Sequence, residues 1–129
     1  MVKRRDVVLI VDDEPVIRRV LRQTLEIADY AVLEAADGFE AVAVLEADQH
    51  RVSAVLTDIT MPHMDGLALV ELMHHAHPTI PVVLASGKHT HGTLPAPIAG
   101  RISGFLDKPY SRASVLAAVA AAIGGGAAA

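Results

Sequence analysis

The stretch "VVLIVDDEPVIRRVL", residues 7–21, combines a strand with the start of a helix. The continuous apolar run Val7–Val11 is typical of a strand buried on both faces of a sheet. Asp12 and Asp13 end this run, and Pro15 suits the first turn of a helix. Each of two adjacent carboxylates raises the cost of ionising the other. The pair is explained either by helix capping, for which one aspartate is enough, or by a bound divalent cation.

Apolar runs and helical periods alternate along the whole chain. Short apolar runs predict further strands, and apolar residues that recur with the helical period predict helices. The expected strands after the first are Tyr30–Ala35, Ala54–Thr57, Pro81–Ala85 and a short one centred on Phe105–Leu106. The first expected helix begins at Pro15, and the others cover Phe39–Ala47, Leu67–His75 and Ser111–Ile123. This alternation predicts an α/β fold, with a five-stranded parallel sheet between two layers of helices.

The composition is that of one folded domain. The chain has 129 residues, of which 52% are hydrophobic and 20% charged, so it can bury a core. The stretch 1–123 is expected to form the domain and the Gly/Ala tail 124–129 to be flexible. The net charge of −4 argues against nucleic-acid binding, and the absence of cysteine excludes thiolate metal sites. No apolar run is long enough to span a membrane, and we expect a cytoplasmic protein.

Polar side chains gather at one end of the expected sheet. Ligands of open parallel sheets bind at the carboxyl ends of the strands. There the two aspartates follow the first strand, Asp58 the third, Ser86 the fourth and Lys108 the fifth. Each residue alone has an ordinary explanation as a cap, a turn residue or a solvated charge. Together they favour a hard cation, because the ligands are oxygens, and Mg²⁺ leaves room for a phosphoryl group.

Four short motifs occur at these strand ends. They are "DDEP" after the first strand, "DITMPHMDG" after the third, "SG" after the fourth and "KP" after the fifth. In combination they resemble the receiver domains of two-component response regulators, and the resemblance extends from Val7 to about Ile123. It implies a flavodoxin-like, doubly wound sheet of strand order 2-1-3-4-5 with helices on both faces, as in a chemotaxis-regulator-like single receiver.

The resemblance implies a magnesium site. Asp13 matches the carboxylate that binds Mg²⁺ directly, and Asp12 matches one that acts partly through water. Asp58 and the backbone carbonyl of Thr60 match the remaining protein ligands. On this interpretation the paired aspartates are tolerated because a cation lies between them and Asp58.

The resemblance also implies a phosphorylation site. Asp58 matches the aspartate that accepts the phosphoryl group, and a carboxylate can form such an acyl phosphate. Ser86 matches the hydroxyl, and Lys108 the ammonium, that contact the phosphoryl oxygens. Phe105 matches the aromatic switch residue whose rotamer follows activation.

One segment departs from the family pattern. Between the serine and lysine motifs, where receivers have a fourth helix, the chain reads "GKHTHGTLPAPIAGRISG". Pro95 and Pro97 disfavour a helix interior, and Gly92 lowers the helix propensity further. We therefore predict a fourth helix that is short, late, irregular or absent, with residues 89–99 the most mobile ordered part of the domain. Because many receivers dimerise through this surface, a monomer or a weak dimer is expected.

The leading hypothesis is a phosphoacceptor module, not an enzyme, that receives phosphate from a sensor histidine kinase or a histidine phosphotransfer protein. The first helix, with Arg18, Arg19 and Arg22, is expected to face that partner. One alternative is a Mg²⁺-dependent phosphatase with an aspartyl-phosphate intermediate, but such enzymes need an acid where Thr60 stands. The other is a receiver-like interaction domain that works without phosphorylation. Nucleotide binding is not indicated, because neither G-x-G-x-x-G nor a P-loop follows the first strand.

Overall fold

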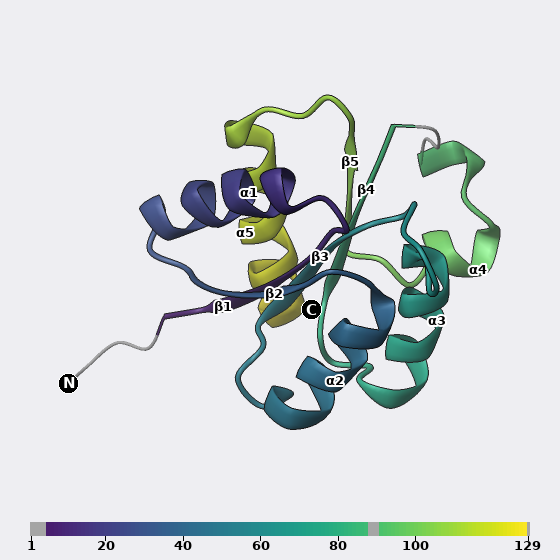
Figure 1. Cartoon of the computed structure of the whole chain (residues 1–129). Coiled ribbons are helices and arrows are strands. Elements are labelled where there is room, and N and C mark those ends of the chain that lie inside the picture. The colour runs from purple at the N-terminus through teal and green to yellow at the C-terminus, as the bar shows by residue number, and fades with distance from the viewer. Residues whose placement is uncertain (1–4, 88–90, 129) are drawn as a thin grey trace.

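A five-stranded parallel sheet forms the centre of the molecule (Figure 1). The computed structural model describes residues 5–87 and 91–128. The strands are β1 (Val7–Val11), β2 (Ala31–Ala35), β3 (Ala54–Asp58), β4 (Val82–Ser86) and β5 (Gly104–Asp107). Their order is β2-β1-β3-β4-β5, as predicted. Because the order reverses between β1 and β3, the residues that follow these two strands meet at the position where such sheets bind ligands.

Helices cover both faces of the sheet. They are α1 (Pro15–Ile27), α2 (Gly38–Asp48), α3 (Gly66–Ala76), the 3-10 turn η1 (His91–Thr93), α4 (Ala96–Ala99) and α5 (Arg112–Ala128). Figure 1 shows α1 and α5 on one face, with α2 and α3 on the other. The predicted doubly wound α/β fold is therefore confirmed. Within residues 5–87 and 91–128, no helix combines the length and the hydrophobicity that crossing a bilayer requires.

The side chains of β1 point in turn to the two faces of the sheet, where they belong to two separate layers of the apolar core. Leu9 and Val11 belong to the layer that contains side chains of α2, α3 and α4, whereas Val8 and Ile10 belong to the layer of α1 and α5. Successive side chains of a strand point to opposite faces, so a strand covered on both faces is apolar at every position. Every residue of β1 is buried. The continuous apolar run at the start of the sequence follows directly from this packing.

The segment before β5 contains the short fourth helix that the sequence predicts. It consists of η1 and then α4, which has only 4 residues. Pro95 is the N-cap of α4, and Pro97 lies in its first turn, where a missing N–H group costs little. Leu94 and Ile98 are buried in the layer of α2 and α3, and they fix the segment to the sheet. Residues 88–90 lie outside the described residues, and the predicted mobility of 89–99 stays a prediction.

The last helix extends further than expected. Ser111 caps it as predicted, since its Oγ accepts the N–H of Ser114 at 3.1 Å. The expected end at Ile123 is wrong, because α5 continues to Ala128. None of the described glycines has a positive φ, so Gly124 does not form the left-handed cap that ends many helices. The flanking alanines have high helix propensity and offset the cost of the glycines. The flexibility of the tail stays a prediction.

Candidate functional site

Three carboxylates meet at the carboxyl ends of β1 and β3. One carboxylate oxygen from each of Asp12, Asp13 and Asp58 lies within 4.8 Å of the others, and this is the one such group of three potential metal ligands among the described residues. Val11 pairs with Thr57 in the neighbouring strands, which places the residues after them side by side. Asp12 is buried and Asp13 is exposed. The predicted convergence of the three acids is therefore present.

Helix capping does not explain the paired aspartates. The N-cap of α1 is Glu14, whose side chain makes no capping hydrogen bond, and the Oδ1 of Asp12 accepts the N–H of Glu14 at 2.9 Å. In contrast, Asp37 and Asp65 are the N-caps of α2 and α3, each accepting a helix N–H at 2.9 Å. The chain thus caps helices with single aspartates elsewhere. The cation explanation remains for the pair.

The cluster carries more negative than positive charge. Burial raises the pKa of the Asp12 carboxyl above its ordinary value, and the charges of Asp58 and Asp13 raise it further. The opposing cation is Lys108, whose Nζ lies 3.1 Å from Oδ2 of Asp58. One ammonium does not balance three carboxylates. Hard oxygen donors with an excess of negative charge fit a divalent cation such as Mg²⁺.

The other expected site residues lie on β4, on β5 and in the loop after β3. Ser86 is buried at the end of β4, next to the strand that carries Asp58. Thr60 is exposed in the loop that follows β3. Phe105 lies on β5, half-buried against the layer of α2 and α3. The structure thus brings Asp58, Asp12, Asp13 and Lys108 into direct proximity. Ser86 ends the neighbouring strand β4, Thr60 lies two residues after Asp58, and Phe105 lies one strand further away, on β5.

The sequence interpretation missed Tyr110. This side chain lines a cavity between α1 and the segment after β5, together with Glu14, Ile17, Val20, Lys108 and Pro109. Burial raises its pKa to about 12, and the charges of Asp12 and Asp58 contribute to this increase. The available signal was its position directly after the "KP" motif.

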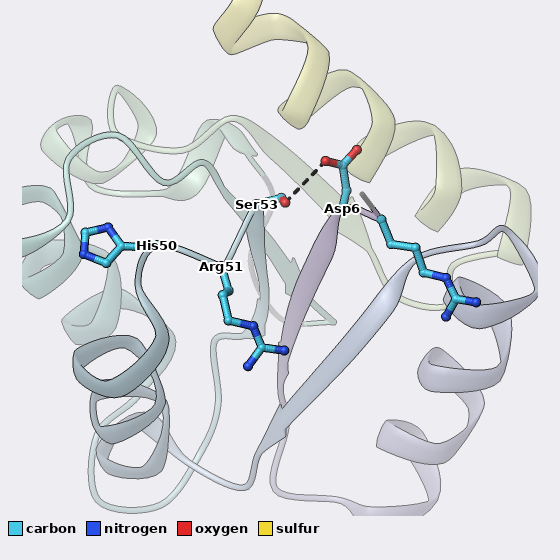
Figure 2. Close-up of a pocket in the computed structure, with 5 residues that line it drawn as sticks. Asp6, His50, Arg51 and Ser53 are labelled. Atoms are coloured by element: carbon cyan, nitrogen blue, oxygen red, sulfur yellow. Dashed lines mark hydrogen bonds between the residues drawn. The ribbon is translucent and has the colours of Figure 1, made fainter. Parts of the chain in front are cut away.

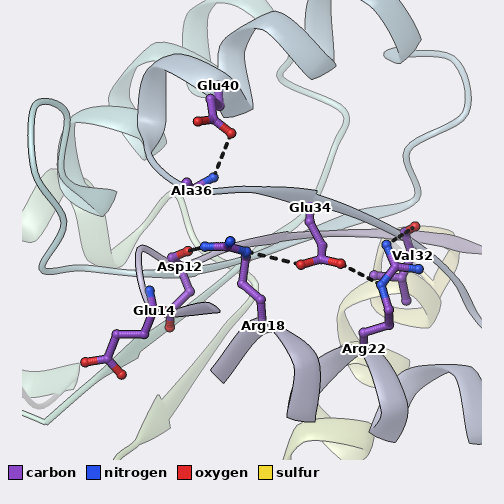
Figure 3. Close-up of polar contacts among 8 residues, drawn as sticks. All are labelled: Asp12, Glu14, Arg18, Arg22, Val32, Glu34, Ala36 and Glu40. Carbon is purple, nitrogen blue, oxygen red and sulfur yellow. Dashed lines mark hydrogen bonds and ion pairs between the residues drawn. The ribbon is translucent and has the colours of Figure 1, made fainter. Parts of the chain in front are cut away.

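Two of the three arginines of α1 are bound to the sheet. Arg18 and Arg22 both bind Glu34 of β2, with N–O distances of 3.1 Å and 2.6 Å (Figure 3). The exposed cation of the three is thus Arg19, and the expectation that this helix faces the partner stays a prediction. The missed signal was an acidic residue in the otherwise apolar strand "AVLEA", together with two arginines one helical turn apart.

A second cavity lies at the opposite end of the sheet. Asp6 and Ser53 line it and precede β1 and β3, and Figure 2 shows the hydrogen bond between them. Its two arginines form ion pairs: Arg5 binds Asp29 and Arg51 binds Asp48, each at 3.3 Å. Because this cavity lies away from the carboxyl ends of the strands and its arginines are paired, we assign it no function.

Comparison with known proteins identifies the family. Residues 8–120 match the response regulator receiver domain. The chain belongs to this family. A receiver domain is a phosphoacceptor module of two-component systems, and in general a switch rather than an enzyme. Receiver domains bind Mg²⁺ at an acidic pocket, which agrees with the cluster described above.

Several curated relatives contain a similar receiver domain within a longer chain. The C4-dicarboxylate transport transcriptional regulatory protein DctD of Rhizobium meliloti is 36% identical over 107 residues, which are 81% of this chain and 22% of DctD. The DctD of Pseudomonas aeruginosa is 34% identical over 119 residues, 90% of this chain and 25% of that protein. The sensor kinase CckA of Brucella abortus is 36% identical over 104 residues, 81% of this chain and 11% of CckA. The chain therefore spans a quarter or less of these relatives.

Solved structures share the receiver fold. The signal receiver domain of an HD domain-containing protein from Pseudomonas fluorescens Pf-5 is 27% identical, with a TM-score of 0.85, and the alignment covers 98% of this chain and 100% of that one. The receiver domain of NtrX from Brucella abortus is 28% identical, with a TM-score of 0.81 and coverage of 91% and 98%. The strand order and helix layers described above are therefore those of the family.

Proposed function

We propose that Asp58 of this receiver domain accepts a phosphoryl group from a phosphohistidine of a sensor histidine kinase or a histidine phosphotransfer protein. The observation that carries this proposal is the position of its carboxylate. It ends β3, its Oδ2 lies 3.1 Å from Nζ of Lys108, and it faces the cluster of Asp12 and Asp13. A carboxylate held between a cation and a site for a second cation is placed for phosphoryl transfer, which depends mainly on positioning and charge neutralisation.

The transfer exchanges one bond to phosphorus for another. A carboxylate oxygen of Asp58 forms a bond to phosphorus, and the bond between phosphorus and the donor's imidazole nitrogen breaks, with its electron pair left on that nitrogen. Lys108 pairs with the incoming phosphoryl oxygens, and Ser86 at the end of β4 donates its hydroxyl to the phosphoryl group. Tyr110 keeps its proton at neutral pH, because its pKa is raised to about 12, and adds no negative charge beside the site.

The residues that would hold Mg²⁺ are the carboxylates of Asp12, Asp13 and Asp58 together with the backbone carbonyl of Thr60. When bound, this ion supplies positive charge that offsets the negative charge of the phosphoryl oxygens. The excess of negative charge in the cluster and the pKa of Asp12, raised by burial and by its acidic neighbours, support this assignment.

The donor would approach over α1. Val16 and Val20 of this helix are exposed, with 71% and 42% of their surface accessible, and Val20 lines the cavity that also contains Lys108. Arg19 is the exposed cation of the same helix.

The protein is proposed to act in the cytoplasm, as a monomer or a weak dimer.

Phosphorylation is proposed to change partner binding through β5 and the segment before it. Ser86 would move toward the phosphoryl group, and Phe105 would follow into the space beside α4. Since α4 has only 4 residues, activation would reorder this segment instead of shifting a rigid helix.

The test is phosphorylation by acetyl phosphate with Mg²⁺, followed by intact mass measurement. The wild-type chain should gain one labile phosphoryl group, and Asp58→Asn should gain none, because an amide is not the required nucleophile. Asp65→Asn is the matched control, since asparagine caps α3 as well as aspartate does. Incorporation into Asp58→Asn at the wild-type level would overturn the assignment.

The same experiment separates the alternative functions. A phosphatase would release inorganic phosphate catalytically and would not accumulate a phosphorylated form. A domain that works without phosphorylation would show no mass gain even in the wild type. Thr60, at the position where a phosphatase of this type has an acid, favours the receiver function.

A further inference from the structure

Arg18 connects α1 to the acidic cluster through a backbone atom. Its Nη1 donates to the main-chain carbonyl of Asp12 at 2.6 Å, and its Nε donates to Oε1 of Glu34 at 3.1 Å (Figure 3). Only 18% of its side-chain surface is exposed. The guanidinium is a planar fork, so two donors engaged at once fix its orientation.

Glu34 holds this guanidinium in place. Its second oxygen, Oε2, accepts from Nε of Arg22 at 2.6 Å. Burial acts to raise the pKa of Glu34, but the hydrogen bonds and charges of Arg22 and Arg18 outweigh it and lower the pKa below its ordinary value. Glu34 is therefore ionised at neutral pH and neutralises much of the charge of Arg18. Arg18 thus approaches the acids without acting as the cation that they need.

The bond from Arg18 bears on both aspartates because they share a peptide group. The carbonyl of Asp12 and the N–H of Asp13 lie in one rigid plane. Two further hydrogen bonds fix Asp12. Its N–H donates to the carbonyl oxygen of Ala35 at 3.1 Å, and its Oδ1 accepts the N–H of Glu14. Arg18 adds the hydrogen bond that sets the rotation of the peptide between Asp12 and Asp13. This rotation fixes the position of the Asp13 Cα, from which its side chain extends.

We propose that Arg18, held by Glu34, is a positioning residue for the metal site: it orients the Asp12–Asp13 peptide so that both carboxylates face one cation together with Asp58. This inference rests on the proposed function, because it assumes that the cluster binds Mg²⁺. Outer partners of this kind commonly change metal affinity roughly 10- to 100-fold when they are removed.

Arg22 provides a matched control. It lies on the same helix, binds the same glutamate and also bonds Glu26 at 3.1 Å. Both arginines tie α1 to β2, but Arg18 donates to the backbone carbonyl of Asp12 at 2.6 Å, whereas Arg22 donates to that of Val32 in β2 at 3.4 Å. A role limited to holding α1 against the sheet predicts the same effect for both substitutions, whereas a positioning role predicts an effect for Arg18 only.

The experiment is calorimetric titration of the full chain with Mg²⁺ alone, together with metal-free thermal melting. Arg18→Met should weaken Mg²⁺ binding roughly tenfold. Arg22→Met should keep the wild-type affinity, while its metal-free melting temperature falls about as much as that of Arg18→Met. Arg18→Lys is the conservative second variant, which tests the proposal even if Arg18→Met does not fold. It keeps the charge opposite Glu34 but lacks the planar fork, and it should also bind Mg²⁺ more weakly than the wild type.

Three outcomes would contradict the inference in different ways. Wild-type affinity in both Arg18→Met and Arg18→Lys would show that the peptide needs no support from this residue. Equal weakening in Arg18→Met and Arg22→Met would reduce the role to general packing. A wild-type chain that binds no Mg²⁺ would overturn the metal site of the proposed function, and the inference with it.

Discussion

Among single residues, Asp13 offers the clearest separation of metal binding from stability. Asp13 is proposed to bind Mg²⁺ directly, and a direct ligand matters no less than an outer partner, so Asp13→Ala should weaken Mg²⁺ binding by at least roughly tenfold. The metal-free melting temperature should not fall, because Glu14 is the N-cap of α1 and one of several crowded charges is removed. Calorimetry and thermal melting measure the two effects. A sharp fall in the metal-free melting temperature would instead indicate a structural role for this carboxylate.

Tyr110 reports the charge of the acidic cluster. Its pKa in the folded protein is raised to about 12 from an ordinary 10.0, first by burial and then by Asp12 and Asp58. The folded state therefore holds this proton more tightly than the unfolded state. The resulting stability is fully present below pH 10.0 and is lost as the pH rises toward 12.

Tyrosinate absorbance checks this expectation. The difference between wild type and Tyr110→Phe should titrate at about 12, and Asp58→Asn should lower that value because one of the raising charges is gone. Tyr30→Phe controls for the loss of a tyrosine elsewhere. A difference signal that titrates at the ordinary value in the folded protein would contradict the burial of Tyr110 beside the acids.

At the scale of elements, the start of α3 packs directly on the end of β3. A Cβ on Gly66 would lie 2.3 Å from the carbonyl oxygen of Asp58 and 2.9 Å from Cα of Ile59. Both neighbours are backbone, so Gly66→Ala should lower the free energy of unfolding by about 1–3 kcal/mol. It should also slow phosphorylation, because the backbone at Asp58 has to move.

Gly100→Ala is the control for this substitution in a chemical denaturation experiment. Gly100 has φ −78° and ψ −8°, and a Cβ there would meet only atoms at 3.9 Å. It should therefore be neutral or stabilise the fold by up to about 1 kcal/mol. If the two substitutions had equal effects on stability, the close contact at Gly66 would not be the cause.

The segment from η1 to α4 should open most readily. Its buried anchors are Leu94 and Ile98, and few buried contacts mean a low free energy of local opening. Amide hydrogen exchange should be faster across residues 91–98 than in α1 or α3. A phosphate mimic such as beryllofluoride should slow it if activation orders this segment. Strong protection across these residues in the unmodified protein would show a stable helix and contradict the proposal.

For the molecule as a whole, the sequence predicted the elements whose signals are local. The five strands followed from apolar runs and their spacing, whereas their order followed from the resemblance carried by the motifs at their ends. The short α4 followed from Pro95 and Pro97. The end of α5 was missed because glycine propensity alone does not decide a helix end among alanines. The site acids were predicted from strand ends. The pairing of Arg18 with Glu34 was not, because it joins a helix to an edge strand 16 positions away.

The division of the core by the sheet has a consequence for how the chain tolerates change. Leu45 is fully buried in one apolar layer and Val119 in the other. Residues this separated share no partners, so the losses of stability in Leu45→Ala and Val119→Ala should add to within about 0.5 kcal/mol in the double variant. Substitutions that remodel one face for a new partner would then lower the total free energy of unfolding without changing the packing on the opposite face. The sequence of such a domain can therefore change on one face of the sheet while the packing of the other face is kept.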